Sequence, residues 1–318
     1  MEAELFAFKN CSNLTNEQIT TIAFARGITA VVCCVLLLIV LVTLAILASL
    51  YPQKVHGTVV KRLAIGLTAA AVLFQLILTL HLKYYFDPQD TTFCKVDAFF
   101  DQYLASVHLL FILGIIVGLF FKVLYLTTSL KFMNEKAKEC TFTFCCWKIN
   151  KLEIVLFTSV FVLPLLFDWI PFATNSYGPY GPWCWIRIIE TDCSTHVAGM
   201  WAKIGLMDVP TGFVALLALV LFAASLCLLW YGTKNAGVEK LVLIEVGITE
   251  TIFFLTFLAV VLSQWSLEVT AKSSYTFWII FALLSPLAFT LIPLALLIAI
   301  QLPFSAMIAC ASVATGVE

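Results

Sequence analysis

Seven long runs of apolar residues occupy most of this 318-residue chain. A helix that crosses a bilayer needs about 20 mostly apolar residues, and each run reaches that length. The runs are continuously apolar and do not alternate with polar residues, so they predict helices rather than the strands of a barrel. We place the seven spans at residues 28–50, 60–82, 97–126, 152–172, 202–231, 241–263 and 274–300.

The composition agrees with these spans. Hydrophobic residues make up 62% of the chain and charged residues only 12%, against roughly 25% charged in a soluble domain. The mean hydropathy is +1.03. The 18 basic and 19 acidic residues nearly balance, which argues against nucleic acid as a partner. We therefore expect an all-α polytopic membrane protein, a seven-transmembrane helix bundle whose surroundings are the lipid bilayer.

The spans divide the chain into a short N-tail (1–27), the membrane domain (28–300) and a short C-tail (301–318). The N-tail lacks a basic segment followed by a short apolar one, so we expect no cleaved signal peptide and an uncleaved first span that acts as anchor. Asn10 and Asn13 each begin an N-x-S/T glycosylation acceptor, which predicts a glycoprotein if the tail lies in the lumen.

Seven spans place the two termini on opposite sides of the membrane. With the N-terminus outside, the inner segments hold eleven basic residues and the outer segments seven, the direction that the positive-inside rule requires. Cys11, Cys94, Cys184 and Cys193 then face the oxidising side, where disulfides persist. These four cysteines permit two bridges, and we favour Cys94 with Cys184 and Cys11 with Cys193.

The longest inner loop covers residues 127–151 and carries five lysines. It could meet anionic lipid or an effector protein, but a solvated basic loop that obeys the positive-inside rule is the interpretation we favour for the lysines. Cys145 and Cys146 stand next to Trp147 in this loop. Inner juxtamembrane cysteines are typical palmitoylation acceptors, so both are candidates for that modification.

This arrangement resembles a G-protein-coupled receptor, in which a cysteine at the head of the third span is paired with one in the loop after the fourth. Residues 183–186 (Trp-Cys-Trp-Ile) are similar to a stretch in the second outer loop of cyclic-AMP-receptor-like and secretin/adhesion-like receptors. Residues 124–126 (Leu-Tyr-Leu) resemble the L-Y-L at the inner end of their third span. The resemblance implies a multi-pass receptor of the plasma membrane, with an extracellular ligand and a cytosolic heterotrimeric G protein as partners.

The chain departs from the rhodopsin-like branch. That branch carries D-R-Y after the third span, C-W-x-P in the sixth and N-P-x-x-Y in the seventh, and none of these occurs here; the seventh span reads Ser285-Pro286-Leu-Ala-Phe289 instead. An N-tail of 27 residues is also too short to fold the large outer domain of the secretin and adhesion receptors. The departures leave G-protein coupling open.

Ionisable residues inside membrane spans are costly and therefore point to function. We expect an outward-facing pocket for a cationic or amine-bearing ligand, with these lining residues: Asp97, Asp101, Tyr103, His108, Asp168, Trp201 and Asp208. For Asp97 and Asp168 the simpler interpretation is contact with water at the headgroups. Asp101 and Asp208 lie deeper and are the stronger candidates.

Two carboxylates occur in the sixth span. Glu245 and Glu250 are five residues apart, so they lie on different faces of a helix and do not form a matched pair. Glu250 lies near mid-membrane, since ten residues separate it from Lys240 and correspond to about 15 Å of helix rise. We expect a polar partner for Glu250 inside the bundle; a proton or cation relay is the alternative.

Other function classes are disfavoured by the sequence. It contains no metal-spaced His/Cys cluster, no Gly-rich phosphate loop and no nucleophile elbow, so we expect neither an enzyme nor a bound cofactor or metal. The seventh span has no lysine that could form a Schiff base with retinal. A small transporter or ion-conducting protein that uses Asp101, Asp208 and Glu250 is the alternative function. Transporters often contain internal repeats, and we find none between the first and last three spans.

Overall fold

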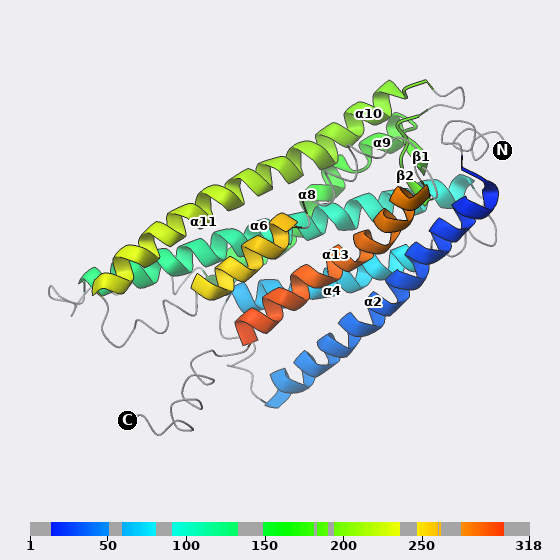
Figure 1. Ribbon diagram of the computed structural model, residues 1–318. Helices are drawn as coiled ribbons and strands as arrows, with labels where there is room; N and C mark the ends of the chain where they lie inside the picture. The colour runs from blue at the N-terminus through cyan, green and yellow to red at the C-terminus, as the bar shows by residue number, and fades with distance from the viewer. Residues whose placement is uncertain are drawn as a thin grey trace.

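The computed structural model describes residues 14–50, 59–80, 91–132, 149–180, 183–189, 194–235, 247–259, 261 and 275–301. The long helices lie side by side in an elongated bundle, and a small β hairpin sits at one end, next to the start of α2 (Figure 1). The elements are α2 (Asn16–Leu50), α4 (Val59–Thr79), α6 (Thr91–Phe132), α8 (Ile149–Phe167), α9 (Ile170–Ala173), β1 (Tyr177–Tyr180), β2 (Trp183–Ile186), α10 (Val197–Lys203), η1 (Ile204–Asp208), α11 (Val209–Asn235), a helix over Gly247–Ala259, and α13 (Tyr275–Gln301).

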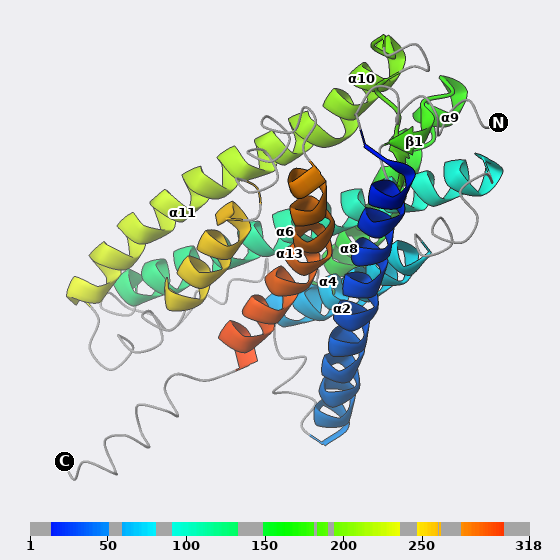
Figure 2. The same cartoon turned by 45° about the vertical axis from the view of Figure 1, so that its right-hand side comes forward.

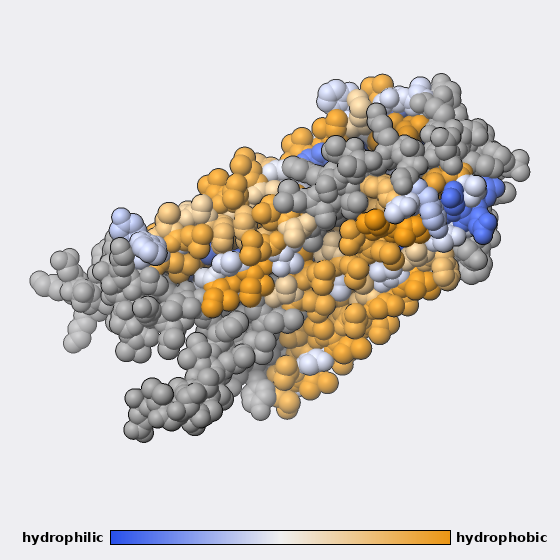
Figure 3. Space-filling model, in the orientation of Figure 1, coloured by the Kyte–Doolittle hydropathy of each residue, from blue (hydrophilic) through white to orange (hydrophobic). Residues whose placement is uncertain are grey.

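Six of the described helical segments are long and apolar enough to cross a membrane. The Gly247–Ala259 helix is apolar but shorter, and the flanks of the span expected at 241–263 lie largely outside the described residues. The face in Figure 3 is mostly hydrophobic, with hydrophilic colours gathered near the start of α2. On α2 itself, Ile39 and Val42 are each 58% exposed. A surface of this kind suits lipid and not water, and together with the six long apolar helices it agrees with a multi-pass membrane protein.

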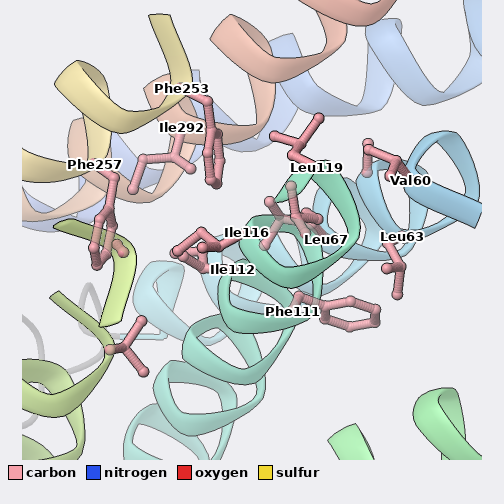
Figure 4. Close-up of a cluster of buried hydrophobic side chains, with 14 of the residues drawn as sticks. Val60, Leu63, Leu67, Phe111, Ile112, Ile116, Leu119, Phe253, Phe257 and Ile292 are labelled. Carbon is pink, nitrogen blue, oxygen red and sulfur yellow. The ribbon is translucent and has the colours of Figure 1, made fainter. Parts of the chain in front are cut away.

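Helix α6 occupies the centre of the bundle, where it packs against α4, α8, α11 and both strands. The main apolar cluster joins α6 to α4, to the Gly247–Ala259 helix and to α13 (Figure 4). Its labelled members are Val60, Leu63, Leu67, Phe111, Ile112, Ile116, Leu119, Phe253, Phe257 and Ile292. Helix α6 is thus the element through which α4, α8, α11 and the hairpin are connected.

Helix α2 begins twelve residues before the apolar run that predicted it. Thr15 and Gln18 form a capping box, in which the Thr15 amide donates to Gln18 Oε1 (2.9 Å) and the Gln18 amide donates to Thr15 Oγ1 (3.2 Å). The charge of Arg26 does not interrupt the helix, because the guanidinium is buried against an acidic partner. Much of the expected N-tail (1–27) is therefore helix.

The fifth span is not one regular helix. Five residues of π-helix, η1, separate α10 from α11. A π-helical turn has more residues than an α-helical turn, so side chains five apart come onto the same face. Lys203 and Asp208 use this geometry, with the Lys203 ammonium 3.0 Å from Asp208 Oδ1. The π turn thus forms an ion pair that a regular helix would separate.

Helix α13 contains Pro286 and Pro293, and a proline weakens the helical hydrogen-bond ladder. A polar side chain from another helix contacts this region. Gln75 of α4 donates from Nε2 to the Pro286 carbonyl oxygen (2.8 Å) and to Thr290 Oγ1 (3.1 Å). Helix α13 is therefore held to α4 at the segment where its own ladder is weakest.

Candidate functional site

A disulfide joins the hairpin to the central helix. Cys94 in the first turns of α6 is bonded to Cys184 in β2, with a Cα–Cα distance of 5.3 Å. Strand β1 pairs antiparallel with β2, and Pro179 lies opposite Cys184. The expected bridge is confirmed, although Cys94 lies inside the helix and not in a loop ahead of it. The bridge fixes the hairpin over the start of α6, where Figure 2 also places it.

A buried guanidinium lies directly beneath the hairpin. Arg26 of α2 is 4% exposed. Its Nη2 donates to Asp101 Oδ2 of α6 at 3.3 Å, and its guanidinium lies over the Trp183 ring, 4.2 Å from the ring centre. Asp97, one turn from Asp101 on α6, is also buried and its charge acts on Arg26. One cation thus lies close to two carboxylates and over an aromatic ring, and it interacts favourably with all three.

A second polar group surrounds Gln102, which is fully buried in α6. Its Oε1 accepts a hydrogen bond from the Trp185 indole of the hairpin (2.9 Å). Its Nε2 donates to Ser106 (3.2 Å), whose hydroxyl donates to Asp168 Oδ1 (3.4 Å). A single chain of hydrogen bonds therefore runs from the hairpin through α6 to the end of α8.

Tyr177 of β1 closes the same region. Its hydroxyl donates to the Asp168 backbone oxygen at 2.6 Å. Burial, followed by the nearby charges of Asp168 and Asp101, raises the pKa of the Tyr177 phenol, so the proton that makes this bond is retained. We call the whole group the hairpin-end cluster; its members are Arg26, Asp97, Asp101, Gln102, Ser106, Asp168, Tyr177, Trp183, Trp185, Lys203 and Asp208.

The structure brings several of the expected pocket residues together at this cluster. Asp97, Asp101 and Asp168 are buried in it, and none of the three is a headgroup contact open to water. The Asp208 carboxylate is bound by Lys203, whose ammonium also lies 6.0 Å from the Trp185 ring centre. Four carboxylates and two cations thus meet at the hairpin end.

The remaining expected pocket residues lie elsewhere. The Tyr103 hydroxyl donates to the Phe161 backbone oxygen of α8 (3.1 Å). Trp201 is 64% exposed on α10 and does not contribute to an enclosed pocket. His108 is buried two turns deeper in α6, where it lines a separate cavity.

Glu250 lies in the Gly247–Ala259 helix, 5% exposed. Its polar neighbour is the fully buried Ser225 of α11. Within the described chain, Glu250 Oε2 has no hydrogen-bond partner. The polar neighbour expected inside the bundle is the Ser225 hydroxyl, which itself makes no hydrogen bond among the described residues, so this carboxyl group is incompletely bonded.

Several expected sites lie outside the described residues. They are the glycosylation acceptors Asn10 and Asn13, the cysteines Cys11 and Cys193, the palmitoylation candidates Cys145 and Cys146, and Glu245. The bridge between Cys11 and Cys193 therefore stays a prediction.

Sequence reasoning missed two central members of the cluster. Arg26 stands outside the apolar run and was counted only as a charge of the outer segments, although its spacing from that run would have allowed one longer helix. Gln102 carries no charge, so a search for ionisable residues did not find it.

Among residues that the structure describes, no group of His, Cys, Asp and Glu could hold a metal ion. No family model matches the chain, and a search of the curated proteins found no match.

Proposed function

We propose that this protein is a seven-transmembrane receptor of the plasma membrane, with its N-terminus outside, that binds an extracellular ligand and signals to a cytosolic heterotrimeric G protein. One observation carries the proposal: the Cys94–Cys184 disulfide attaches the hairpin to α6, the helix that contacts most of its neighbours. A ligand that moves the hairpin would therefore act directly on the centre of the bundle. Such a ligand shifts the protein between two packings only by its difference in affinity for them.

The hairpin-end cluster supports a cationic or amine-bearing ligand. Its four carboxylates outnumber its two cations, so the group carries excess negative charge when all are ionised. Arg26 already neutralises part of this charge through Asp101. An incoming amine would compete with the guanidinium for the carboxylates of α6, and that competition would loosen the contact between α2 and α6.

Nucleotide exchange on purified G proteins tests the proposal. The protein, reconstituted in nanodiscs, is incubated with a panel of heterotrimers and a library of amine-bearing compounds. We expect faster exchange on at least one heterotrimer, and loss of the ligand response in Arg26→Gln. Lys95→Gln is the matched control, because the Lys95 side chain donates an exposed hydrogen bond to Asn175 and not to the carboxylates of the cluster. Exchange at the background rate across the whole panel contradicts the receptor function.

The proposed orientation has its own test. Glycosylation at Asn10 or Asn13 requires the N-tail to enter the lumen. Treatment of the cell-expressed protein with a peptide N-glycosidase should increase its gel mobility, and the double substitution of both asparagines by glutamine should remove that change. An unglycosylated protein whose N-tail is protected from antibody on intact cells contradicts this orientation.

Glu250 favours one second candidate, a small transporter or ion-conducting protein. A buried carboxyl group with an unpaired oxygen is a common feature of proton and ion paths. Asp101 and Asp208 support that path less, because each is bound by a cation. Proton or cation flux into proteoliposomes decides between the two functions: flux that Glu250→Gln abolishes supports the transporter, and no flux above that of empty vesicles excludes it.

A further inference from the structure

A small cavity lies deeper in the bundle than the hairpin-end cluster. It is bounded by α6, the fifth-span segment, the Gly247–Ala259 helix and α13. Most of its lining is apolar and includes Ile112, Phe257 and Ile292. Two polar side chains also line it, His108 of α6 and Thr211 of α11. None of the lining residues carries a full charge at neutral pH if the imidazole is uncharged.

Both polar side chains lack the partners that buried groups require. His108 is 1% exposed and Thr211 is 6% exposed. In the described part of the chain, the two ring nitrogens of His108 have no hydrogen-bond partner, and the Thr211 hydroxyl has none either. Buried polar groups are hydrogen-bonded in the large majority of cases, and leaving one unpaired is destabilising. Three such atoms around one cavity indicate that something else completes their hydrogen bonds.

Water alone is a poor occupant. The volume open to the centre of a water molecule is about 40 Å³, against roughly 10–15 Å³ for a single water, so a few waters would fit. A stable buried water needs two to four polar partners. His108 and Thr211 offer too few for several waters, and the apolar remainder of the lining offers none.

We infer that this cavity binds an uncharged, largely apolar small molecule through one hydroxyl or carbonyl group, which bonds to His108 and Thr211. An apolar body matches the lining, and one polar group can bond to the Thr211 hydroxyl and to one of the two His108 ring nitrogens. A charged ligand is disfavoured, because no counter-charge lines the cavity to offset its desolvation. This site is distinct from the hairpin-end cluster, and its existence does not depend on G-protein coupling.

The space must enlarge for such a molecule to enter. Phe289 of α13 lines one side, and its ring centre lies 4.8 Å from that of His108 and 4.1 Å from that of Phe74. It stands between Pro286 and Pro293, where the helix is most easily bent. Binding would therefore displace Phe289 and change the course of α13, which connects occupancy of the cavity to helix position.

Photolabelling tests the inference directly. The full chain in phosphatidylcholine nanodiscs is irradiated with a photoreactive octanol that carries a diazirine, and the labelled residues are mapped by mass spectrometry. We expect saturable labelling of the cavity lining that excess 1-octanol removes. Labelling confined to lipid-facing positions such as Leu163, without saturation, overturns the proposal.

Substitutions sharpen the test. Thr211→Val removes one hydroxyl without changing volume, and we expect about five-fold weaker competition by octanol, the effect of one hydrogen bond of ordinary strength. Ala288→Val fills part of the cavity and should abolish cavity labelling. Thr256→Val and Ala259→Val are the matched controls on the Gly247–Ala259 helix and should label as the parent does. Cavity labelling that is unchanged in both test variants refutes the site.

A structural role for His108 is distinguished by stability. If the imidazole is unpaired until a ligand binds, His108→Leu removes a buried unpaired group. The ligand-free variant should then unfold at a temperature a few degrees higher than the parent protein, and competition by octanol should weaken. A variant that is both less stable and unimpaired in competition contradicts the proposal. Should that variant fail to fold, the Thr211 and Ala288 substitutions still decide the outcome. None of these results depends on nucleotide exchange, so failure of the receptor proposal is measured separately.

Discussion

Arg26 of α2 and Asp101 of α6 form a buried ion pair across 75 positions of sequence, with Nη2 and Oδ2 3.3 Å apart. The pair joins the first and third spans beneath the hairpin. Trp183 covers the guanidinium from the hairpin side, so this cation of α2 contacts two other elements, α6 and β2. A change in the protonation, the partner or the position of Arg26 therefore alters contacts among α2, α6 and β2 together.

Removing Arg26 should destabilise the fold more than removing Asp101. Arg26→Leu leaves Asp97 and Asp101 buried without their cation, and breaking a buried pair in this way costs about 3–5 kcal/mol. Asp101→Asn leaves Arg26 with Asp97, so we expect a smaller loss. Thermal unfolding of the purified variants in detergent measures the order. Lys95→Leu, at a half-buried position away from the ion pair, should change stability little; a larger loss for Asp101→Asn than for Arg26→Leu would contradict this assignment.

The Cys94–Cys184 disulfide should stabilise the hairpin end, and losing either cysteine should have the same effect. Cys94→Ser and Cys184→Ser should each reduce surface expression and lower the unfolding temperature, since loss of a native disulfide typically costs about 2–5 kcal/mol. The double variant should be no worse than either single one, because both remove the same bond. Cys227→Ser is the control, as this exposed cysteine is unbonded. Full surface expression of both single variants would contradict a structural role.

Gly66 of α4 marks a close contact between helices. A Cβ atom at this position would lie 2.7 Å from the nearest Phe111 ring atom and 2.9 Å from the Phe157 ring. Gly66→Val should therefore destabilise the bundle by about 1–3 kcal/mol through overpacking. Gly205→Ala is the matched control, because a Cβ there meets nothing within 4 Å. Equal unfolding temperatures for Gly66→Val and the parent protein would disprove the close contact.

The sequence predicted the helical membrane architecture from local signals, and the Cys94–Cys184 bridge from the placement of two cysteines on the expected oxidising side of the membrane. Length and hydropathy identify a span without knowledge of its neighbours, and a cysteine at the start of a span is visible in the sequence. The helix ends were less accurate. The extension of α2 to Asn16 depends on a capping box and on the burial of Arg26, and the second of these exists only once α6 is packed beside it.

The candidate site was predicted in its residue types more than in its arrangement. Asp97, Asp101 and Asp168 were found because ionisable residues are rare in spans. Their partners were not, since pairing of Arg26 with Asp101 or of Gln102 with Trp185 joins segments 75 and 83 residues apart. Asp208 was expected to be a pocket carboxylate, but the π turn places Lys203 beside it. Sequence periodicity assumes a regular helix and cannot foresee that turn.

Replacing Gln75 by glutamate should lower the stability of the protein more than replacing it by leucine. Its Nε2 donates to the Pro286 carbonyl and to Thr290, while its Oε1 has no partner among the described residues. Gln75→Leu removes the donor and the unpaired acceptor together, and Thr290 still bonds to the Pro286 oxygen (3.0 Å), so the change in stability should stay within about 1 kcal/mol. Gln75→Glu keeps the shape but must either bury a charge beside the Pro286 carbonyl or take up a proton, so it should cost more at neutral pH, about 1–3 kcal/mol. Thermal unfolding of the two variants measures the difference, and a more stable Glu variant would show that Gln75 does not hold α13 through this donor.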